Sequence, residues 1–164
     1  MNKRILYLGW MALLIMLFGC QPKTNIGKID ALKKQVETQR RALNTLQNKD
    51  YVQLERDFYA CDSLLQYMHP EEVDEAFAQL RLAGAYLEQF KEVKPVMEAE
   101  MDSCLTRLGL LRADAESQYL TDSLVTLYLN DETQAVDRLA NQVKYFADRF
   151  GTSQKVLDQI KNNR

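Results

Sequence analysis

The stretch VDRLANQVKYFADRF, residues 136–150, carries apolar side chains at alternating spacings of three and four residues. Because an α-helix makes one turn every 3.6 residues, this spacing places those side chains along one face. A helix with one apolar face has to bury that face against other helices. The stretch therefore predicts a bundle of helices. Its apolar side chains are Val136, Leu139, Val143, Phe146 and Phe150.

The same spacing extends over most of the chain on both sides of this stretch. Gly and Pro, the residues that most readily interrupt helices, are rare between positions 28 and 150. We therefore predict an all-α fold, an elongated antiparallel helical bundle or coiled-coil-like hairpin of three to four long helices. We expect one such domain over residues 26–164. The only Gly and Pro residues between positions 28 and 150 are Pro70, Gly84, Pro95 and Gly109.

Local patterns predict where these helices begin, bend or end. Residues 69–72, HPEE, predict a boundary, because Pro loses no hydrogen bond at a first helical position and carboxylates complement the positive helix end. Pro95 predicts a kink or an end, and the unbroken phase of the apolar pattern across it favours a kink. Asp131 predicts a new helix start and Gly151 predicts its end, with one short helix after it.

The first helix shows a shift in its apolar pattern. The pattern of residues 29–46 resumes at Tyr51, one residue later than a strict repeat of seven requires. Such a shift keeps the apolar face pointing one way on a helix that supercoils little. We therefore predict a nearly straight helix over residues 26–68, about 64 Å long at 1.5 Å per residue.

The composition excludes several classes of protein. Of the 164 residues, 46% are hydrophobic and 27% charged, which is typical of a folded domain. The formal charge of −2 argues against nucleic-acid binding. A single histidine, His69, which we interpret as a turn residue, excludes most His-based metal and acid–base sites. The chain has no phosphate loop, nucleophile elbow or zinc-protease motif, so we expect no cofactor, no metal and no enzyme activity.

The first 20 residues, MNKRILYLGWMALLIMLFGC, have the pattern of a secretory signal. Lys3 and Arg4 precede an uncharged run over residues 5–18, which is shorter than the roughly 20 residues of a membrane-spanning helix. The run ends in Leu17-Phe18-Gly19-Cys20, and over these 20 residues the chain resembles a bacterial lipoprotein precursor. Phe18 departs from the small or β-branched residue usual at its position.

This resemblance implies a covalent anchor at Cys20. In lipoproteins of this class the Cys sulfur carries two acyl chains, and cleavage in front of the Cys frees an amine that is usually acylated too. Residues 1–19 would then be the signal peptide and residues 20–25 a short linker. Gln21 is not an acidic retention signal, so the resemblance implies the outer membrane, facing the periplasm. The alternative is an ordinary signal peptide or an uncleaved anchor with an incidental Cys.

The residues after Cys20 are basic. Residues 21–45 hold six Lys and Arg against two acidic residues. Such a stretch either contacts anionic lipid headgroups or forms an ordinary solvated helix face.

Cys61 and Cys104 are the two other thiols, and the cell envelope permits a disulfide. If the chain doubles back at Pro95, the two lie at similar heights in the bundle. If the helix continues through Pro95, they lie roughly 50 Å apart, whereas a bridge needs Cα atoms within about 7 Å. Both also occupy apolar positions, where a buried free thiol is common.

Taken together, these patterns predict a membrane-anchored envelope lipoprotein that acts as a non-catalytic scaffold or adaptor for a protein partner. The alternative is a periplasmic ligand-binding or inhibitory module of the immunity-protein kind. A peptidoglycan-linked spacer fits less well, because the carboxyl end KNNR lacks a terminal Lys. Self-association is also open. Candidates for a partner surface are Tyr59, Tyr67, Tyr86, Tyr119, Tyr128 and Tyr145.

Overall fold

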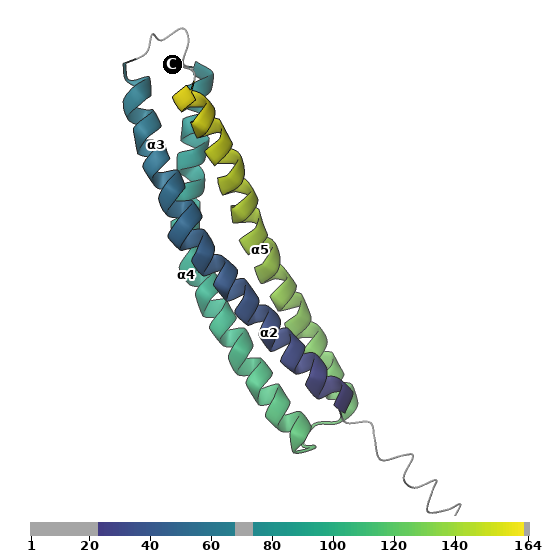
Figure 1. Ribbon diagram of the computed structural model, residues 1–164. Coiled ribbons are helices and arrows are strands. Elements are labelled where there is room, and N and C mark those ends of the chain that lie inside the picture. The colour runs from purple at the N-terminus through teal and green to yellow at the C-terminus, as the bar shows by residue number, and fades with distance from the viewer. Residues whose placement is uncertain (1–22, 68–73, 163–164) are drawn as a thin grey trace, which may run out of the picture.

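Long helices account for nearly all of the residues that the computed structural model describes, which are 23–67 and 74–162 (Figure 1). The longest, α4, has 43 residues, so it extends about 65 Å at 1.5 Å per residue. The elements are α2 (Lys23–Thr45), the π-helix η1 (Leu46–Tyr51), α3 (Val52–Leu65), α4 (Asp74–Glu116) and α5 (Asp122–Asn162). α2, η1 and α3 follow one another directly and are called the first arm below.

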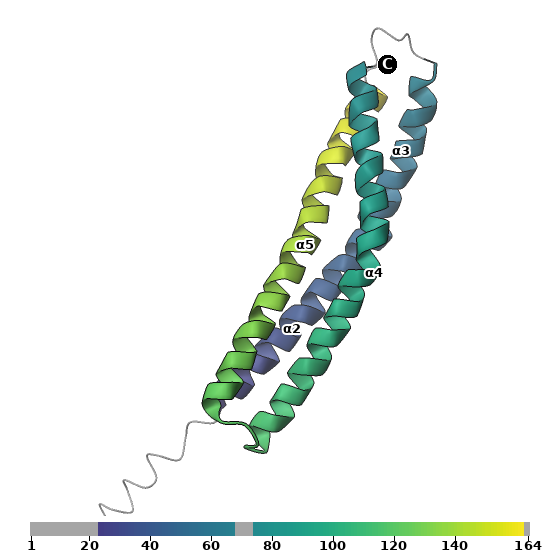
Figure 2. The same ribbon diagram turned by 180° about the vertical axis from the view of Figure 1, so that it is seen from behind.

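Three arms make up the bundle, and each runs antiparallel to the next one along the chain. The first arm runs away from the start of α2, α4 returns beside it, and α5 runs parallel to the first arm (Figures 1 and 2). Each arm contacts both of the others. The start of α2 therefore lies at the same end as the α4–α5 turn, and the end of α5 lies beside the end of α3. The predicted all-α antiparallel bundle is confirmed.

The core follows the alternation of three and four residues that the sequence predicts. In α5 every step from Val125 to Leu157 is three or four residues, and every residue on that series is buried. The equivalent series in α4 runs from Leu80 to Leu111. Because all three arms turn such a face inward, one continuous core fills the bundle along its length.

The shift in the pattern of the first arm is taken up by η1. Leu46 and Tyr51 are five residues apart and both buried, although residues at that spacing lie on different faces of a regular α-helix. The wider turn of the π-helix inserts the extra residue locally and returns the apolar face to the core. The sequence predicts one nearly straight helix over residues 26–68, whereas the structure divides this segment at η1 into the α-helices α2 and α3, and α3 ends at Leu65.

Two predicted boundaries are wrong, because α5 runs unbroken from Asp122 to Asn162 through both Asp131 and Gly151. The core face continues across both positions, since Glu132 and Ser153 occupy buried steps of the series. Tertiary packing here overrides the local signals for a helix start and a helix end. α4 likewise continues through Pro95, which therefore does not end the helix.

The amino-terminal boundary also differs from the prediction. α2 begins at Lys23, so the helix includes residues 23–25, which the sequence placed in the linker. The predicted signal peptide, Cys20 and the predicted boundary at residues 69–72 lie outside the described residues.

A short turn joins α4 to α5. Gln118 has a φ of 56°, the left-handed conformation that commonly ends a helix. The Tyr119 amide donates to the Asp114 carbonyl at 3.0 Å, which closes the end of α4. The Val125 amide donates to the Thr121 carbonyl at 3.0 Å and begins α5. The two helices are therefore held close together at this end.

Candidate functional site

A buried carboxylate, Asp57 of α3, faces α5 in the half of the bundle far from the α4–α5 turn. Its Oδ2 accepts hydrogen bonds from Gln53 Nε2 at 2.8 Å and Gln154 Nε2 at 2.5 Å. Its Oδ1 lies 3.0 Å from Lys161 Nζ, and Lys161 also lies 2.7 Å from Asp158. These five residues are called the Asp57 layer below.

The Asp57 layer keeps its carboxylate ionised. Burial alone would raise the pKa of Asp57, but the hydrogen bonds from Gln53 and Gln154 and the charge of Lys161 outweigh it, so the pKa is lowered. A carboxylate with a lowered pKa that is already bonded to three donors is a poor general base. The layer therefore has the properties of a structural cross-link between α3 and α5.

A second buried carboxylate, Glu132 of α5, lies in the half near the α4–α5 turn. Arg107 of α4 contacts it with both arms of its guanidinium, at 2.5 Å from Nε and 3.0 Å from Nη2. Arg107 also lies 3.6 Å from Glu100 and donates to the Cys104 sulfur at 3.2 Å. These four residues are called the Glu132 layer. Its contacts join α4 to α5 as the Asp57 layer joins α3 to α5.

Cys61 and Cys104 are buried free thiols in different halves of the bundle. Cys61 contacts the Leu157 carbonyl at 3.5 Å, whereas Cys104 lies in the Glu132 layer. Leu157 and Glu132 are 25 residues apart on one continuous helix, which separates the thiols by roughly 35 Å. The possible disulfide is therefore not formed, because α4 does not double back at Pro95.

Burial also lowers the reactivity of both thiols. It raises the pKa of the Cys61 thiol and raises the pKa of the Cys104 thiol to about 11, in both cases mainly by removing the thiolate from water. Since the thiolate is the reactive form, neither cysteine is activated as a nucleophile.

An aromatic block separates the two layers. Phe90 of α4 lies 5.6 Å from the Tyr51 ring, 5.1 Å from the Phe146 ring and 5.2 Å from the Phe150 ring, measured between ring centroids. Tyr51 donates to Glu55 at 3.0 Å. Burial, followed by this hydrogen bond, raises the pKa of Tyr51 to about 12. The π-helix thus brings a polar-tipped ring into the centre of the core.

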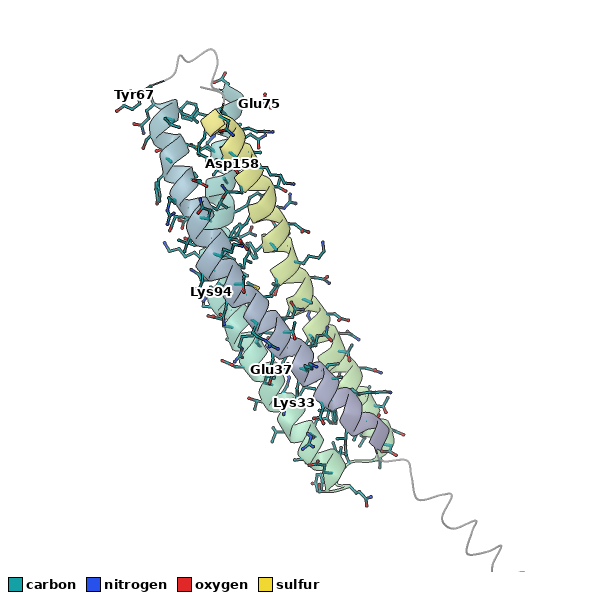
Figure 3. All side chains as sticks on the ribbon, viewed as in Figure 1. Lys33, Glu37, Tyr67, Glu75, Lys94 and Asp158 are labelled. Carbon is teal, nitrogen blue, oxygen red and sulfur yellow. The ribbon has the colours of Figure 1, made fainter. Side chains whose placement is uncertain are left out.

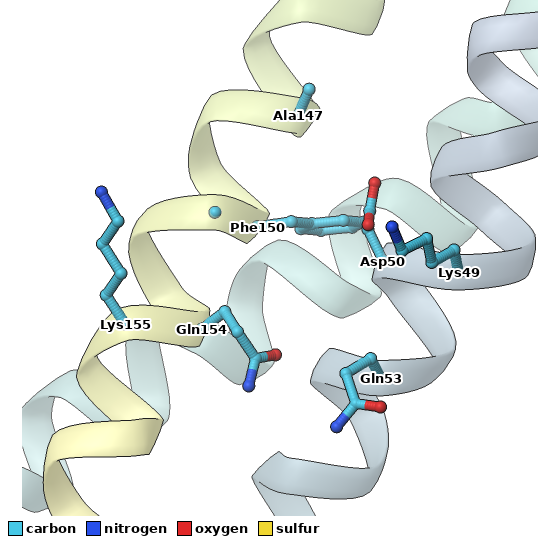
Figure 4. Close-up of a pocket in the computed structure, with 8 residues that line it drawn as sticks. Lys49, Asp50, Gln53, Ala147, Phe150, Gln154 and Lys155 are labelled. Atoms are coloured by element: carbon cyan, nitrogen blue, oxygen red, sulfur yellow. The ribbon is translucent and has the colours of Figure 1, made fainter.

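A groove opens on the surface beside this block, between η1 and α3 on one side and α5 on the other (Figure 4). It holds about 520 Å³. The Phe150 ring, which is almost fully buried, points from α5 toward Asp50 and Lys49 of η1 beside the groove (Figure 4). Gly151 leaves open space at its position, and Lys155 lines the α5 side. This groove is one candidate for a small-ligand site in the part of the chain described.

Other kinds of site find no support over residues 23–67 and 74–162. No three His, Cys, Asp or Glu side chains in these ranges are grouped so that they could hold a metal ion. None of the helices described is apolar enough over a sufficient length to cross a bilayer. Every fully buried side-chain nitrogen and oxygen in these ranges has a hydrogen-bond partner, so no orphaned polar group points to a missing ligand.

Three polar core residues, Asp57, Glu132 and Ser153, were not predicted from the sequence. In the first arm Asp57 takes the buried step between Leu54 and Cys61, and the neighbouring Phe58 is only partly buried. The signal was present, because each of the three polar residues is three or four positions from its buried neighbours in the series. Counting the spacing without regard to polarity would have found Glu132 and Ser153, whereas Asp57 and Phe58 both fit the spacing between Leu54 and Cys61.

Comparisons of the chain with protein-family models, with curated proteins and with solved structures found no match. The candidate sites therefore rest on their geometry and chemistry.

Proposed function

We propose that this protein is a lipid-anchored helical scaffold of the bacterial cell envelope, attached through Cys20 and acting by contact with a protein partner. The closeness of the anchor to the bundle carries this proposal. α2 begins at Lys23, so only Gln21 and Pro22 stand between Cys20 and the first helical residue. Three residues of extended chain reach at most about 11 Å, so an anchor at Cys20 would hold one end of the bundle against the membrane.

The length of the bundle fits a spacer that places a partner away from the bilayer. Its three arms contact one another along the core, so it resists bending more than a single helix would. With one end at the membrane, an upright bundle would reach roughly 60 Å from it. Together with the predicted absence of a cofactor or catalytic motif, this favours a scaffold over an enzyme.

Four of the six candidate tyrosines divide into two groups. Tyr86 and Tyr145 contact each other edge to face, and the guanidinium of Arg149 lies 5.4 Å and 5.2 Å from their ring centroids. Their rings are therefore engaged within the bundle. By contrast, Tyr59 and Tyr67 of the first arm are exposed, and Tyr67 lies at the end far from α2's start (Figure 3). These two are the residues we propose for contact with the partner.

The test is cross-linking in living cells followed by purification from native membranes. We expect the wild-type chain to capture one stoichiometric partner, and we expect Cys20→Ala to lose both the membrane association and the partner. A Tyr59→Ser/Tyr67→Ser variant should keep the anchor and lose the partner. Its matched control, Thr38→Ser on the exposed face of α2, should keep both. An anchored wild-type chain that captures nothing, or only itself, would contradict the scaffold.

A ligand-binding or inhibitory module is the second candidate function. The groove between η1, α3 and α5 is the observation that favours it. The groove is lined by the cationic side chains of Lys49 and Lys155, with Asp50 as a carboxylate among them, and the two lysines suit a small anionic ligand. Such a ligand should raise the unfolding temperature of the wild-type chain and not of Gly151→Leu, in which a side chain enters the groove. Equal shifts for both chains would exclude the groove as the site.

A further inference from the structure

Exposed apolar side chains gather at the end of the bundle where α4 turns into α5. Their exposed fractions range from 41% for Leu124 to 81% for Tyr119. Single exposed apolar residues are ordinary, whereas a group at one place indicates a contact surface. This group is called the turn-end patch, and its members are Leu110, Tyr119, Leu124, Leu127 and Tyr128.

The turn-end patch forms one surface across two helices. Leu124, Leu127 and Tyr128 are spaced by three and four residues, so they share a face of α5 that lies outside the buried series. Leu110 of α4 and Tyr128 of α5 line a common groove of about 340 Å³ together with Leu120. The face ends at Asp131, the next residue along it. The apolar surface is therefore confined to the end of the bundle.

This end is also the one at which α2 begins, as both views of the bundle show (Figures 1 and 2). Residues 122–128 cover about 10 Å of helix, which is close to the roughly 5–10 Å to which apolar side chains enter a membrane interface. An anchor at Cys20 would thus hold the patch within reach of the bilayer, because Lys23 follows it by only three residues.

We propose that the turn-end patch inserts into the interface of the bilayer that carries the Cys20 anchor and so holds the bundle upright. The proposal rests on the anchoring part of the proposed function. It adds a second point of membrane contact, which a single flexible attachment lacks. The end with Tyr67 then points away from the membrane, where a partner can reach it (Figure 3).

The charges at this end indicate an apolar contact instead of an electrostatic one. Asp114 lines the groove, and Asp122 begins α5. Arg112 is already paired with Asp30 at 3.0 Å and Glu116 at 3.0 Å, and Arg107, which lines the groove, is paired with Glu132. Other cations at this end, such as Lys28, belong to the start of α2 and lie outside the patch. The contact should therefore form on zwitterionic phosphatidylcholine vesicles and need no anionic lipid.

The test uses a single tryptophan as a depth probe in the acylated protein, reconstituted into phosphatidylcholine vesicles with brominated acyl chains. Trp10 is the only tryptophan of the sequence and lies in the predicted signal peptide, so a cleaved chain has none of its own. Tyr119→Trp places the probe in the turn-end patch. Tyr67→Trp is the matched control, because Tyr67 is 90% exposed at the opposite end.

We expect bromine to lower the fluorescence of Tyr119→Trp about twofold and to leave Tyr67→Trp unchanged, given the shallow depth of an interfacial contact. Adding Leu124→Asn/Leu127→Asn should remove the quenching, whereas Leu82→Asn/Val96→Asn, at exposed positions outside the patch, should not. Equal quenching of both probes in an acylated chain would overturn the proposal and leave the anchor intact. A chain whose intact mass shows an unmodified Cys20 would overturn both.

Discussion

The Asp57 layer and the Glu132 layer each hold a buried carboxylate, but they do so with different donors in the two halves of the bundle. Each places a carboxylate on a buried step of the core series, close to a buried cysteine. Three donors from two arms hold Asp57, namely Gln53, Gln154 and Lys161. Glu132 depends mainly on Arg107.

This difference in the number of donors should decide how much stability each half loses when one donor is substituted. A buried charge is costly when its partner is lost and nearly neutral when it remains paired. Loss of Lys161 leaves Asp57 with two hydrogen bonds, whereas loss of Arg107 leaves Glu132 without its two close donors. The number of donors, more than the burial of the carboxylate, should therefore set the sensitivity of each half.

The largest effect is expected from Phe90→Ala, in the aromatic block between the layers. Phe90 is fully buried and contacts three other rings, so its loss should lower the free energy of unfolding by about 3–5 kcal/mol. Urea denaturation followed by circular dichroism measures this change. If the two halves share one core, the variant unfolds in a single transition. Two separated transitions would show that the halves fold independently.

Arg107→Met and Lys161→Met compare the layers directly. Both keep an unbranched apolar stem and remove the charge. We expect Arg107→Met to lower the free energy of unfolding by about 2 kcal/mol, because Glu132 is left buried without its two close hydrogen bonds. Lys161→Met should lower the free energy of unfolding by about 1 kcal/mol or less, because Gln53 and Gln154 still donate hydrogen bonds to Asp57. Urea denaturation of the two variants measures both losses. Equal losses, or a larger one for Lys161→Met, would contradict the role assigned to the number of donors.

Lowering the pH should reduce the contribution of Asp57 to folding stability, and comparison with a variant that lacks the carboxylate measures this contribution. Because the folded pKa of Asp57 is lowered, its contribution to stability is present above the unfolded value of about 3.9 and is lost as the pH falls through the folded value. Asp57→Asn lacks this contribution at every pH. The stability gap between the wild type and Asp57→Asn should therefore narrow below about pH 4. A gap of constant size down to about pH 2.5 would show that Asp57 does not titrate as described.

The smallest effects concern the glycines of α4. A Cβ atom added at Gly109 would meet open space, so Gly109→Ala should stabilise the fold by about 0.5–1 kcal/mol through helix propensity. At Gly84 a Cβ atom would lie 2.9 Å from Phe58 Cε2. Gly84→Ala should therefore stabilise the fold less than Gly109→Ala does, or destabilise it. Thermal unfolding of the two variants side by side tests this difference, and an equal gain at both would contradict the close approach of α3 and α4.

The fold class was predictable because it depends on a periodicity that most of the chain obeys. The series from Val136 to Phe150 occupies the core as predicted. The helix ends were less predictable, because Asp131 and Gly151 carry local signals that the core face of α5 overrides. The π-helix could not be predicted from the shift at Tyr51 alone, since a gradual change of supercoil and a local wide turn place the same residues inward.

The candidate sites were less predictable still. The two layers pair residues from separate arms, such as Arg107 with Glu132, and a single sequence carries no sign of which arms meet at which height. The position of Cys61 relative to Cys104 depended on whether α4 continued through Pro95, which the sequence left open. Once that point is fixed, helix geometry alone keeps the thiols apart.

Intact mass spectrometry of the protein purified from its membranes shows whether Cys20 carries an anchor. We predict a chain that begins at Cys20, with a mass increase equal to the acyl groups on its sulfur and amine. Cys20→Ala should lack the increase and leave the membrane fraction. A wild-type mass that includes residues 1–19, or one that begins at Cys20 without acyl groups, would show that the protein is not anchored through Cys20.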